Sequence, residues 1–158
     1  MSGTGAARVG RLDASGLRVA IVAASWHDQV MSGLIAGAQA ACDSAGASCV
    51  VIRVPGAFEL PIAAAACADA GYDAIVALGT VVRGGTPHFE YVCDAATSGL
   101  SRVAIEARTP VGFGLLTCDT VEQALDRAGL PGSSEDKGRE AAEAAIATAL
   151  ALRDIPTP

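Results

Sequence analysis

The chain alternates short apolar runs with helical segments, and this alternation limits its possible folds more than any other feature. Four apolar runs, rich in Val, Ile, Leu and Ala, predict buried strands. The expected strands are residues 17–24, 47–54, 73–80 and 110–117. Helices are expected after each of the first three strands, ending near residues 44, 71 and 101, and over 120–128 and 137–153 after the fourth.

This order, β-α-β-α-β-α-β-α-α, predicts one parallel sheet with right-handed crossovers and helices on both faces. In such sheets, ligands bind outside the carboxyl ends of the strands. Trp26 follows the first expected strand, residues 57–59 follow the second, and residues 81–88 follow the third. Together with the segment near Phe113, which we place at the same edge, these loops are expected to form one site.

The loop after the third strand carries the most unusual run of residues: Gly84, Gly85, Thr86, Pro87 and His88. Glycines let a backbone approach a ligand closely. Thr86 and Pro87 are expected to be the N-cap and first residue of a helix, whose unpaired N–H groups favour an anion such as phosphate. His88 would then lie beside that anion and could transfer protons near neutral pH. An ordinary strand-to-helix turn with a surface histidine stays open as the alternative.

Two common nucleotide-binding motifs do not fit this chain. From Gly79 the spacing follows that of a P-loop, but Gly85 stands where a P-loop has its phosphate-binding lysine. None of the expected strands is followed by a G-x-G-x-x-G pattern. The sequence therefore disfavours a nucleoside triphosphatase and a dinucleotide-binding protein.

Two further helix starts are predicted from capping residues. Asp28 is expected to cap the first helix, and Asp119 with Glu122 resembles a capping box before the helix at 120–128. Residues 1–16 are rich in Gly, Ala and Ser and are expected to form a flexible N-terminal arm. Residues 17–158 are then one domain, a length that suits a single substantial core.

Composition narrows the class of protein further. The formal net charge of −6 disfavours a nucleic-acid-binding protein, which needs a basic face. The five cysteines form no C-x-x-C pair and lie in apolar segments, which predicts buried free thiols in a reducing compartment and no metal site. No apolar run reaches the roughly 18 residues of a membrane-spanning helix. We therefore expect a cytoplasmic protein.

Three motifs together resemble the lumazine synthase family of riboflavin biosynthesis: residues 55–61, residues 79–92, and residues 122–129 followed by Lys137 and Gly138. The resemblance covers about residues 17–153. It implies a flavodoxin-like three-layer α/β sandwich with a four-stranded parallel sheet. It also implies a transferase that condenses 5-amino-6-(D-ribitylamino)uracil with 3,4-dihydroxy-2-butanone 4-phosphate, releasing phosphate and water, without a metal or redox cofactor.

The resemblance assigns a role to each candidate binding residue. The substrate-binding residues implied within one subunit are Trp26, Ala57, Phe58, Glu59, Val81, Val82, Gly85 and Thr86. The pyrimidine ring is implied to stack on Trp26, where the family usually has Phe, and the ribityl chain to lie against residues 57–59. The two valines would give backbone contacts, while Gly85 and Thr86 would donate to the phosphate.

The implied catalytic residues are His88, as the proton-transfer group, and Arg127, on the phosphate. Phe113, Arg127 and Lys137 match positions that the neighbouring subunit contributes in the family. The resemblance therefore implies a homopentamer with active sites between subunits.

Two alternatives remain beside the enzyme. One is a flavodoxin-like module that binds a flavin or pterin without turnover, and the other is a purely structural shell protein. Residues 130–136 form a longer turn than that of icosahedral family members and contain Pro131. A longer turn should obstruct packing at a five-fold axis, so we expect an isolated pentamer rather than an icosahedral shell.

Overall fold

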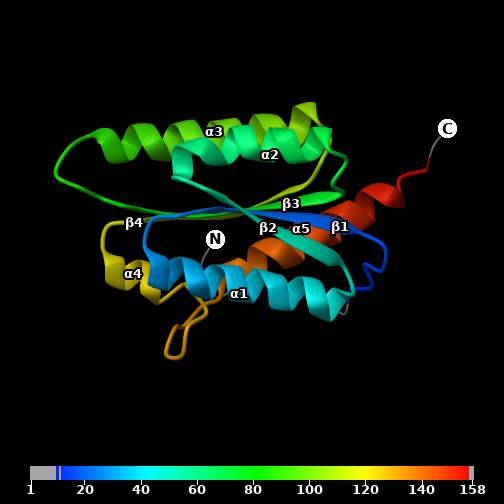
Figure 1. Cartoon of the computed structure of the whole chain (residues 1–158), viewed down its shortest axis with the longest axis horizontal. Helices are drawn as coiled ribbons and strands as arrows, with labels where there is room; N and C mark the ends of the chain where they lie inside the picture. The colour runs from blue at the N-terminus through cyan, green and yellow to red at the C-terminus, as the bar shows by residue number, and fades with distance from the viewer. Residues whose placement is uncertain (1–9, 11, 157–158) are drawn as a thin grey trace.

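The computed structural model describes residue 10 and residues 12–156, and within these a four-stranded sheet lies between two layers of helices (Figure 1). Most of the expected N-terminal arm, residues 1–9 and 11, lies outside the described residues. The strands are β1 (Arg18–Ala24), β2 (Ser48–Val54), β3 (Ala74–Val82) and β4 (Val111–Cys118). The helices are α1 (Asp28–Ala45), the 3-10 turn η1 (Ala57–Glu59), α2 (Leu60–Asp69), α3 (His88–Glu106), α4 (Val121–Leu125) and α5 (Lys137–Arg153).

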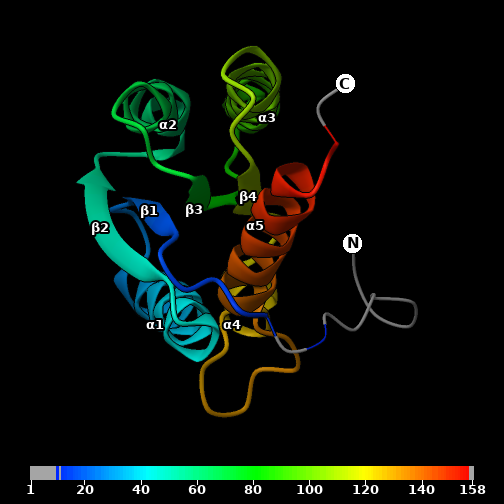
Figure 2. The same cartoon turned by 90° about the vertical axis from the view of Figure 1, so that its right-hand side faces the viewer.

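The strands are all parallel and lie in the order β2-β1-β3-β4. This is the strand order of flavodoxin-like, doubly wound sheets. Helices α2 and α3 cover one face, and α1 and α5 cover the other, with α4 beside them (Figure 2). The expected three-layer α/β sandwich, with helices on both faces of a parallel sheet, is confirmed.

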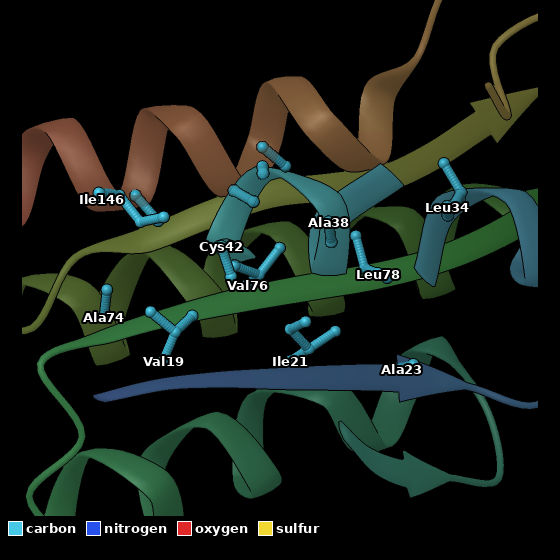
Figure 3. Close-up of a cluster of buried hydrophobic side chains, with 14 of the residues drawn as sticks. Val19, Ile21, Ala23, Leu34, Ala38, Cys42, Ala74, Val76, Leu78 and Ile146 are labelled. Atoms are coloured by element: carbon cyan, nitrogen blue, oxygen red, sulfur yellow. The ribbon is translucent and has the colours of Figure 1, made fainter. Parts of the chain in front are cut away.

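Strand β1 divides its side chains between two cores, because successive residues of a strand point to opposite faces of the sheet. Its odd-numbered residues, from Val19 to Ala23, enter the core under α1 and α5, which also contains Ile146 (Figure 3). Its even-numbered residues, from Ala20 to Ala24, enter the core under α2 and α3. The run is therefore apolar throughout, as a strand buried on both faces must be.

Glycines let α1 pack closely against α5 and the segment that precedes it. A Cβ added at Gly33 would lie 2.2 Å from the carbonyl oxygen of Ala128, and one at Gly138 would lie 2.0 Å from that of Leu34. Both distances are far below van der Waals contact, so no larger side chain fits without movement. This packing fixes the segment between α4 and α5, which carries Arg127.

The starts of α1 and α3 differ from the sequence-based expectation. The N-cap of α1 is His27, which is left-handed with φ 61° and ψ 64°, and Asp28 is the first helical residue. A cap residue must itself lie outside helical conformation, so Asp28 instead places its charge in the first turn, where it complements the helix dipole. Helix α3 begins at His88, with Pro87 rather than Thr86 as the residue before it.

The capping arrangement of α4 is shifted by one residue from the expected pair Asp119 and Glu122. Thr120 is the N-cap, and its Oγ1 accepts a hydrogen bond from the Gln123 N–H at 3.3 Å. The side-chain oxygen of Gln123 accepts from the Asp119 N–H at 2.8 Å. Thr120 takes the cap because it has the extended backbone, φ −135°, that a cap needs. The helix also ends earlier than expected, at Leu125.

Strand β3 and helix α3 continue past their expected ends. Strand β3 runs to Val82 because it stays paired with β4, up to the pair Val82 and Cys118. Helix α3 runs to Glu106. The longer β3 brings its last residues to the start of the glycine-rich loop.

The described residues 12–16, at the end of the expected arm, lie against the sheet domain. Ala14 is buried, and its N–H donates to the Ala45 carbonyl at the end of α1 at 2.7 Å. Leu12 packs against the core under α1 and α5.

The five cysteines are free thiols, of which Cys42, Cys67 and Cys118 are buried, while Cys49 and Cys93 are partly exposed. Complete burial was expected from their apolar segments, and it holds for three of them. In the part of the chain that the structure describes, no helix combines the length and apolar character needed to span a membrane.

Candidate active site

A hollow of about 420 Å³ opens at the carboxyl edge of the sheet. Its walls come from the residues after β1, from residues 56–59 after β2, from residues 80–82 of β3 and from the first turns of α3. Parallel sheets bind ligands at this edge. The hollow brings together these expected site residues: Trp26, Ala57, Phe58, Glu59, Val81, Val82 and His88.

The turn between β1 and α1 holds Trp26 at the hollow. Ser25 fastens this turn to the end of β2, because its hydroxyl donates to the Val54 carbonyl at 2.8 Å and its N–H donates to the Pro55 carbonyl at 3.3 Å. His27 then adopts its left-handed conformation and leads the chain into α1. The Trp26 side chain is 68% exposed, which leaves an aromatic face on which a planar ligand can stack.

The turn after β2 places a carboxylate close to that indole ring. Residues 57–59 form the single turn η1, in which the Glu59 N–H donates to the Gly56 carbonyl at 3.3 Å. A Cβ added at Gly56 would lie 3.2 Å from the Glu59 carboxylate and 3.7 Å from the indole nitrogen of Trp26. Phe58 is exposed beside them. The hollow thus offers a hydrogen-bond acceptor near an exposed aromatic ring, which suits a ligand that carries hydroxyl groups.

The loop from β3 to α3 has open space around its glycines. The Arg83 N–H donates to the Cys118 carbonyl at 2.9 Å, which continues the β3–β4 pairing to the start of the loop. Among the described residues, apart from the chain neighbours, nothing lies within 4 Å of the position that a Cβ would take on Gly84 or Gly85. His88 then begins a helix of 19 residues, whose N-terminal dipole favours a negative charge. The loop therefore has both the room and the field for a phosphate group.

The Arg83 side chain makes contacts that the sequence analysis did not anticipate. Its Nε donates to Asp119 Oδ1 at 2.8 Å, its Nη1 donates to Glu90, and its guanidinium lies 4.2 Å from the centre of the Phe89 ring. Hydrogen bonds to Asp119 and Glu90 raise the pKa of Arg83, and the bond from Arg83 lowers the pKa of Glu90. The spacing of Arg83 and Glu90 across a helix start is the sequence signal that could have suggested one of these contacts.

Phe113 lies away from this hollow. It is the third residue of β4 and pairs with Ala77 in the middle of β3, so our expectation that it shares the carboxyl edge of the sheet is wrong. The strand was predicted correctly, but Phe113 falls too early in it to reach the edge. Because β4 is an edge strand, its Phe113 ring is 48% exposed.

The exposed Phe113 ring lines a second hollow of about 520 Å³, between α3, β4 and α5. Its lining is mainly apolar and includes Ile105 and Leu152, with Arg108 as a charged member. This hollow is larger, but its described lining residues include no set of polar groups that could carry out chemistry. The smaller hollow at the carboxyl edge is therefore the candidate active site.

Arg127 and Lys137 also lie outside the candidate site of their own chain, and Glu135 lies between them. Glu135 Oε2 is 3.7 Å from Arg127 Nε and 3.2 Å from Lys137 Nζ, while Glu140 accepts from Lys137 at 2.7 Å. Burial lowers the pKa of Lys137, but the hydrogen bonds to Glu140 and Glu135 outweigh it and raise the pKa overall. Gln123 fixes Arg127 further by accepting its Nη1–H at 2.8 Å through its backbone carbonyl.

Gly85 and Thr86 lie in the exposed loop that adjoins the candidate site, next to His88. The flavodoxin-like sheet carries one hollow that is surrounded by aromatic rings, a carboxylate, a histidine and a glycine-rich helix start. This combination defines an α/β enzyme for a small polar ligand. Residues 16–153 match the sequence model described as 6,7-dimethyl-8-ribityllumazine synthase. The chain belongs to this family, and the predicted enzyme class, a transferase of riboflavin biosynthesis, is confirmed.

Curated relatives match the chain along nearly its whole length. The 6,7-dimethyl-8-ribityllumazine synthase of Clavibacter michiganensis subsp. michiganensis is 61% identical over 157 residues, which cover 98% of each chain. That of Leifsonia xyli subsp. xyli is 62% identical over 156 residues, or 98% of this chain and 99% of the relative. That of Streptomyces coelicolor is 57% identical over 159 residues, or 100% of this chain and 99% of the relative.

Proposed function

We propose that this protein condenses 5-amino-6-(D-ribitylamino)uracil with 3,4-dihydroxy-2-butanone 4-phosphate to 6,7-dimethyl-8-ribityllumazine, and releases phosphate and water. This is the penultimate step of riboflavin synthesis. The observation that carries the proposal is the hollow where Trp26, the turn 57–59 and His88 meet, in a chain of this family. We infer that no metal or redox cofactor is needed, because joining an amine to a ketone requires only proton transfers.

The pyrimidine substrate would lie on the exposed face of Trp26. An indole offers a larger stacking surface than the phenyl ring usual in the family, so the replacement keeps the binding mode. The ribityl hydroxyls would donate to the Glu59 carboxylate, which lies near the indole. The ends of β3 at Val81 and Val82 line the same hollow and would give backbone contacts to the ring.

The phosphate of the second substrate would lie at the loop before α3. The backbone N–H groups of Gly85 and Thr86 would donate to it, and the open space around Gly85 leaves room for the group. The α3 dipole favours the same charge. Arg127 would add a charge-assisted contact that strengthens as the phosphate departs.

His88 would carry protons between the reacting atoms during imine formation, phosphate elimination and ring closure. It lines the hollow at the first position of α3, between the proposed pyrimidine and phosphate subsites. An amine attacks a ketone without a powerful protein nucleophile, so much of the rate would come from holding two substrates together.

We propose that Phe113, Arg127 and Lys137 complete the site from a neighbouring subunit of a homopentamer. None of the three lines the candidate hollow of its own chain. The apolar hollow along the edge strand β4, with Ile105 77% exposed, is a surface suited to burial against another copy. The turn 130–136 would keep the pentamer isolated, and the free thiols suit a cytoplasmic location.

The test is an activity assay on the purified full chain. Both substrates are mixed with the protein, and lumazine absorbance and phosphate release are followed in parallel against the uncatalysed background. Equal amounts of the two products above background would establish the reaction. Tight binding of the pyrimidine without product would instead favour the flavin- or pterin-binding module.

Assembly is tested separately by light scattering on the same sample. A mass of five chains is expected. A mass near a megadalton would indicate an icosahedral shell and would contradict the inference from the turn 130–136.

A further inference from the structure

One side chain, that of Arg83, connects the three segments around the glycine-rich loop. Arg83 directly follows β3, and its guanidinium reaches Glu90 in the first turn of α3 and stacks on the neighbouring Phe89. The contact with Glu90 therefore spans the loop 84–87 from end to end. The contact with Asp119, at 2.8 Å, joins the same loop to the segment that follows β4.

The loop itself contains little that could fix its shape. Gly84 and Gly85 have no side chains, no described residue beyond their chain neighbours lies within 4 Å of where a Cβ would stand, and Thr86 is exposed. Glycine backbones sample many conformations, so a loop of this composition needs a constraint from outside. The Arg83 guanidinium is suited to that task, because it is a rigid planar fork that can hold two carboxylates and stack on a ring at once.

We propose that Arg83 is a positioning residue, which holds the loop 84–87 and the first turn of α3 so that His88 and the loop N–H groups meet the substrate phosphate in one geometry. The inference rests on the proposed function. Among the described residues, Arg83 is not part of the lining of the hollow, and Asp119 and Glu90 already engage its guanidinium. It therefore acts through the loop rather than on the substrate.

The positive charge of Arg83 also supports a role at this position. Glu90 and Asp119 are carboxylates close to a proposed anion site, and without a cation between them they would repel the phosphate. Their side chains are 55% and 64% exposed, so these ion pairs contribute little to folding stability. A loss of catalysis without a loss of stability thus separates positioning from a merely structural role.

The first experiment compares Arg83→Met with Arg102→Met. Arg102 is a matched control, because it pairs with Glu106 at 3.2 Å on the exposed surface of α3, the helix whose first turn Arg83 contacts. Arg83→Met should raise KM for the butanone phosphate about tenfold and lower kcat about tenfold, since a small misplacement of reacting groups costs this much. KM for the pyrimidine should change less than about twofold, because other contacts hold Trp26. Arg102→Met should match the wild type.

The double variant Glu90→Ala/Asp119→Ala separates positioning from direct contact. It keeps Arg83 but removes the oxygens that accept its hydrogen bonds, so its kcat should fall as in Arg83→Met. Arg83→Lys restores the positive charge but not the planar fork. Its KM for the butanone phosphate should therefore lie between those of the wild type and Arg83→Met. Wild-type kinetics in the double variant beside an impaired Arg83→Met would mean that Arg83 contacts the substrate, and the inference would be overturned. Equal kinetics of Arg83→Met and Arg102→Met would overturn it as well.

Hydrogen exchange over residues 84–93, measured without substrate, tests the constraint independently of turnover. Exchange should be at least about threefold faster in Arg83→Met and in the double variant, and unchanged in Arg102→Met. If the wild type makes no lumazine but exchange behaves in this way, the proposed function fails while the constraint on the loop stands. If hydrogen exchange in Arg83→Met equals that of the wild type, the inference is overturned, even when the wild type turns over its substrates normally.

Discussion

Replacing Gly33 with alanine tests the close packing that holds the Arg127 segment. Inside a helix this change normally stabilises the protein by about 1 kcal/mol, because alanine loses less backbone entropy on folding. Here the added Cβ would lie 2.2 Å from the Ala128 carbonyl oxygen and 2.9 Å from Leu130 Cγ. Carbon and oxygen normally approach to about 3.3 Å, so the segment must move by about 1 Å.

Overpacking of this kind costs about 1–3 kcal/mol, and the upper end applies because the contacted oxygen belongs to the backbone. Subtracting the propensity gain of about 1 kcal/mol leaves a net destabilisation of about 2 kcal/mol. For a chain of this length, that loss lowers Tm by about 4–8 °C. Because Arg127 directly precedes Ala128, we also expect the folded Gly33→Ala protein to have a lower kcat/KM than the wild type.

The free energy of unfolding is measured by urea denaturation at one fixed protomer concentration, because the proposed assembly would make apparent stability depend on concentration. Ala36→Gly is the matched control, since Ala36 is exposed on the same helix and should lose about 1 kcal/mol from propensity alone. If Gly33→Ala proved as stable as the wild type while Ala36→Gly showed its expected loss, the packing argument would be wrong.

Three further predictions concern the site and a buried thiol. In steady-state kinetics, Arg127→Ala should lower kcat/KM more than His88→Ala, because water or substrate phosphate replaces a proton carrier more easily than a bidentate anion contact; the opposite order would contradict this. Trp26→Ala should raise the pyrimidine KM at least about tenfold, whereas Trp26→Phe should stay within about threefold, because a phenyl ring keeps a stacking face. Burial, followed by the nearby Cys49, raises the pKa of Cys42 from 9.0 to about 12. The unfolded chain therefore releases this proton at a lower pH than the folded chain. The free energy of unfolding should thus fall as pH rises from about 9 to about 12. Measured by urea unfolding, the free energy of unfolding of Cys42→Ala should fall less over this pH range than that of the wild type. An equal fall in both proteins would refute the assignment.

The layers of the fold follow from local pattern, whereas its helix starts depend on tertiary contacts. An apolar run such as Val19 to Ala24 can be satisfied only between two cores, so the parallel sheet is readable from the sequence. At the start of α1, His27 and Asp28 are both polar. Which of them leaves helical conformation is decided by the turn that Ser25 fastens to β2, a contact that no spacing rule contains.

The candidate site likewise contains some residues that the sequence predicts and others that it does not. Trp26 and His88 are predictable because parallel topology brings the ends of β1 and β3 to one edge. Phe113 is not, because the register of β4 against β3 decides how far along the strand it lies. The contact of Arg83 with Asp119 joins residues 36 positions apart, so it appears only when the two loops are seen together.

Trp26 is the only tryptophan in the chain, and it stands exposed in the wall of the candidate site. Any change in indole emission therefore originates at this one place. A heterocycle that stacks on the ring should quench that emission, so titration would report occupancy in the unlabelled protein. Rapid-mixing records of the same signal would separate the arrival of the pyrimidine from the slower steps of ring closure. The residue proposed to hold the substrate is thus also an intrinsic optical probe of its binding.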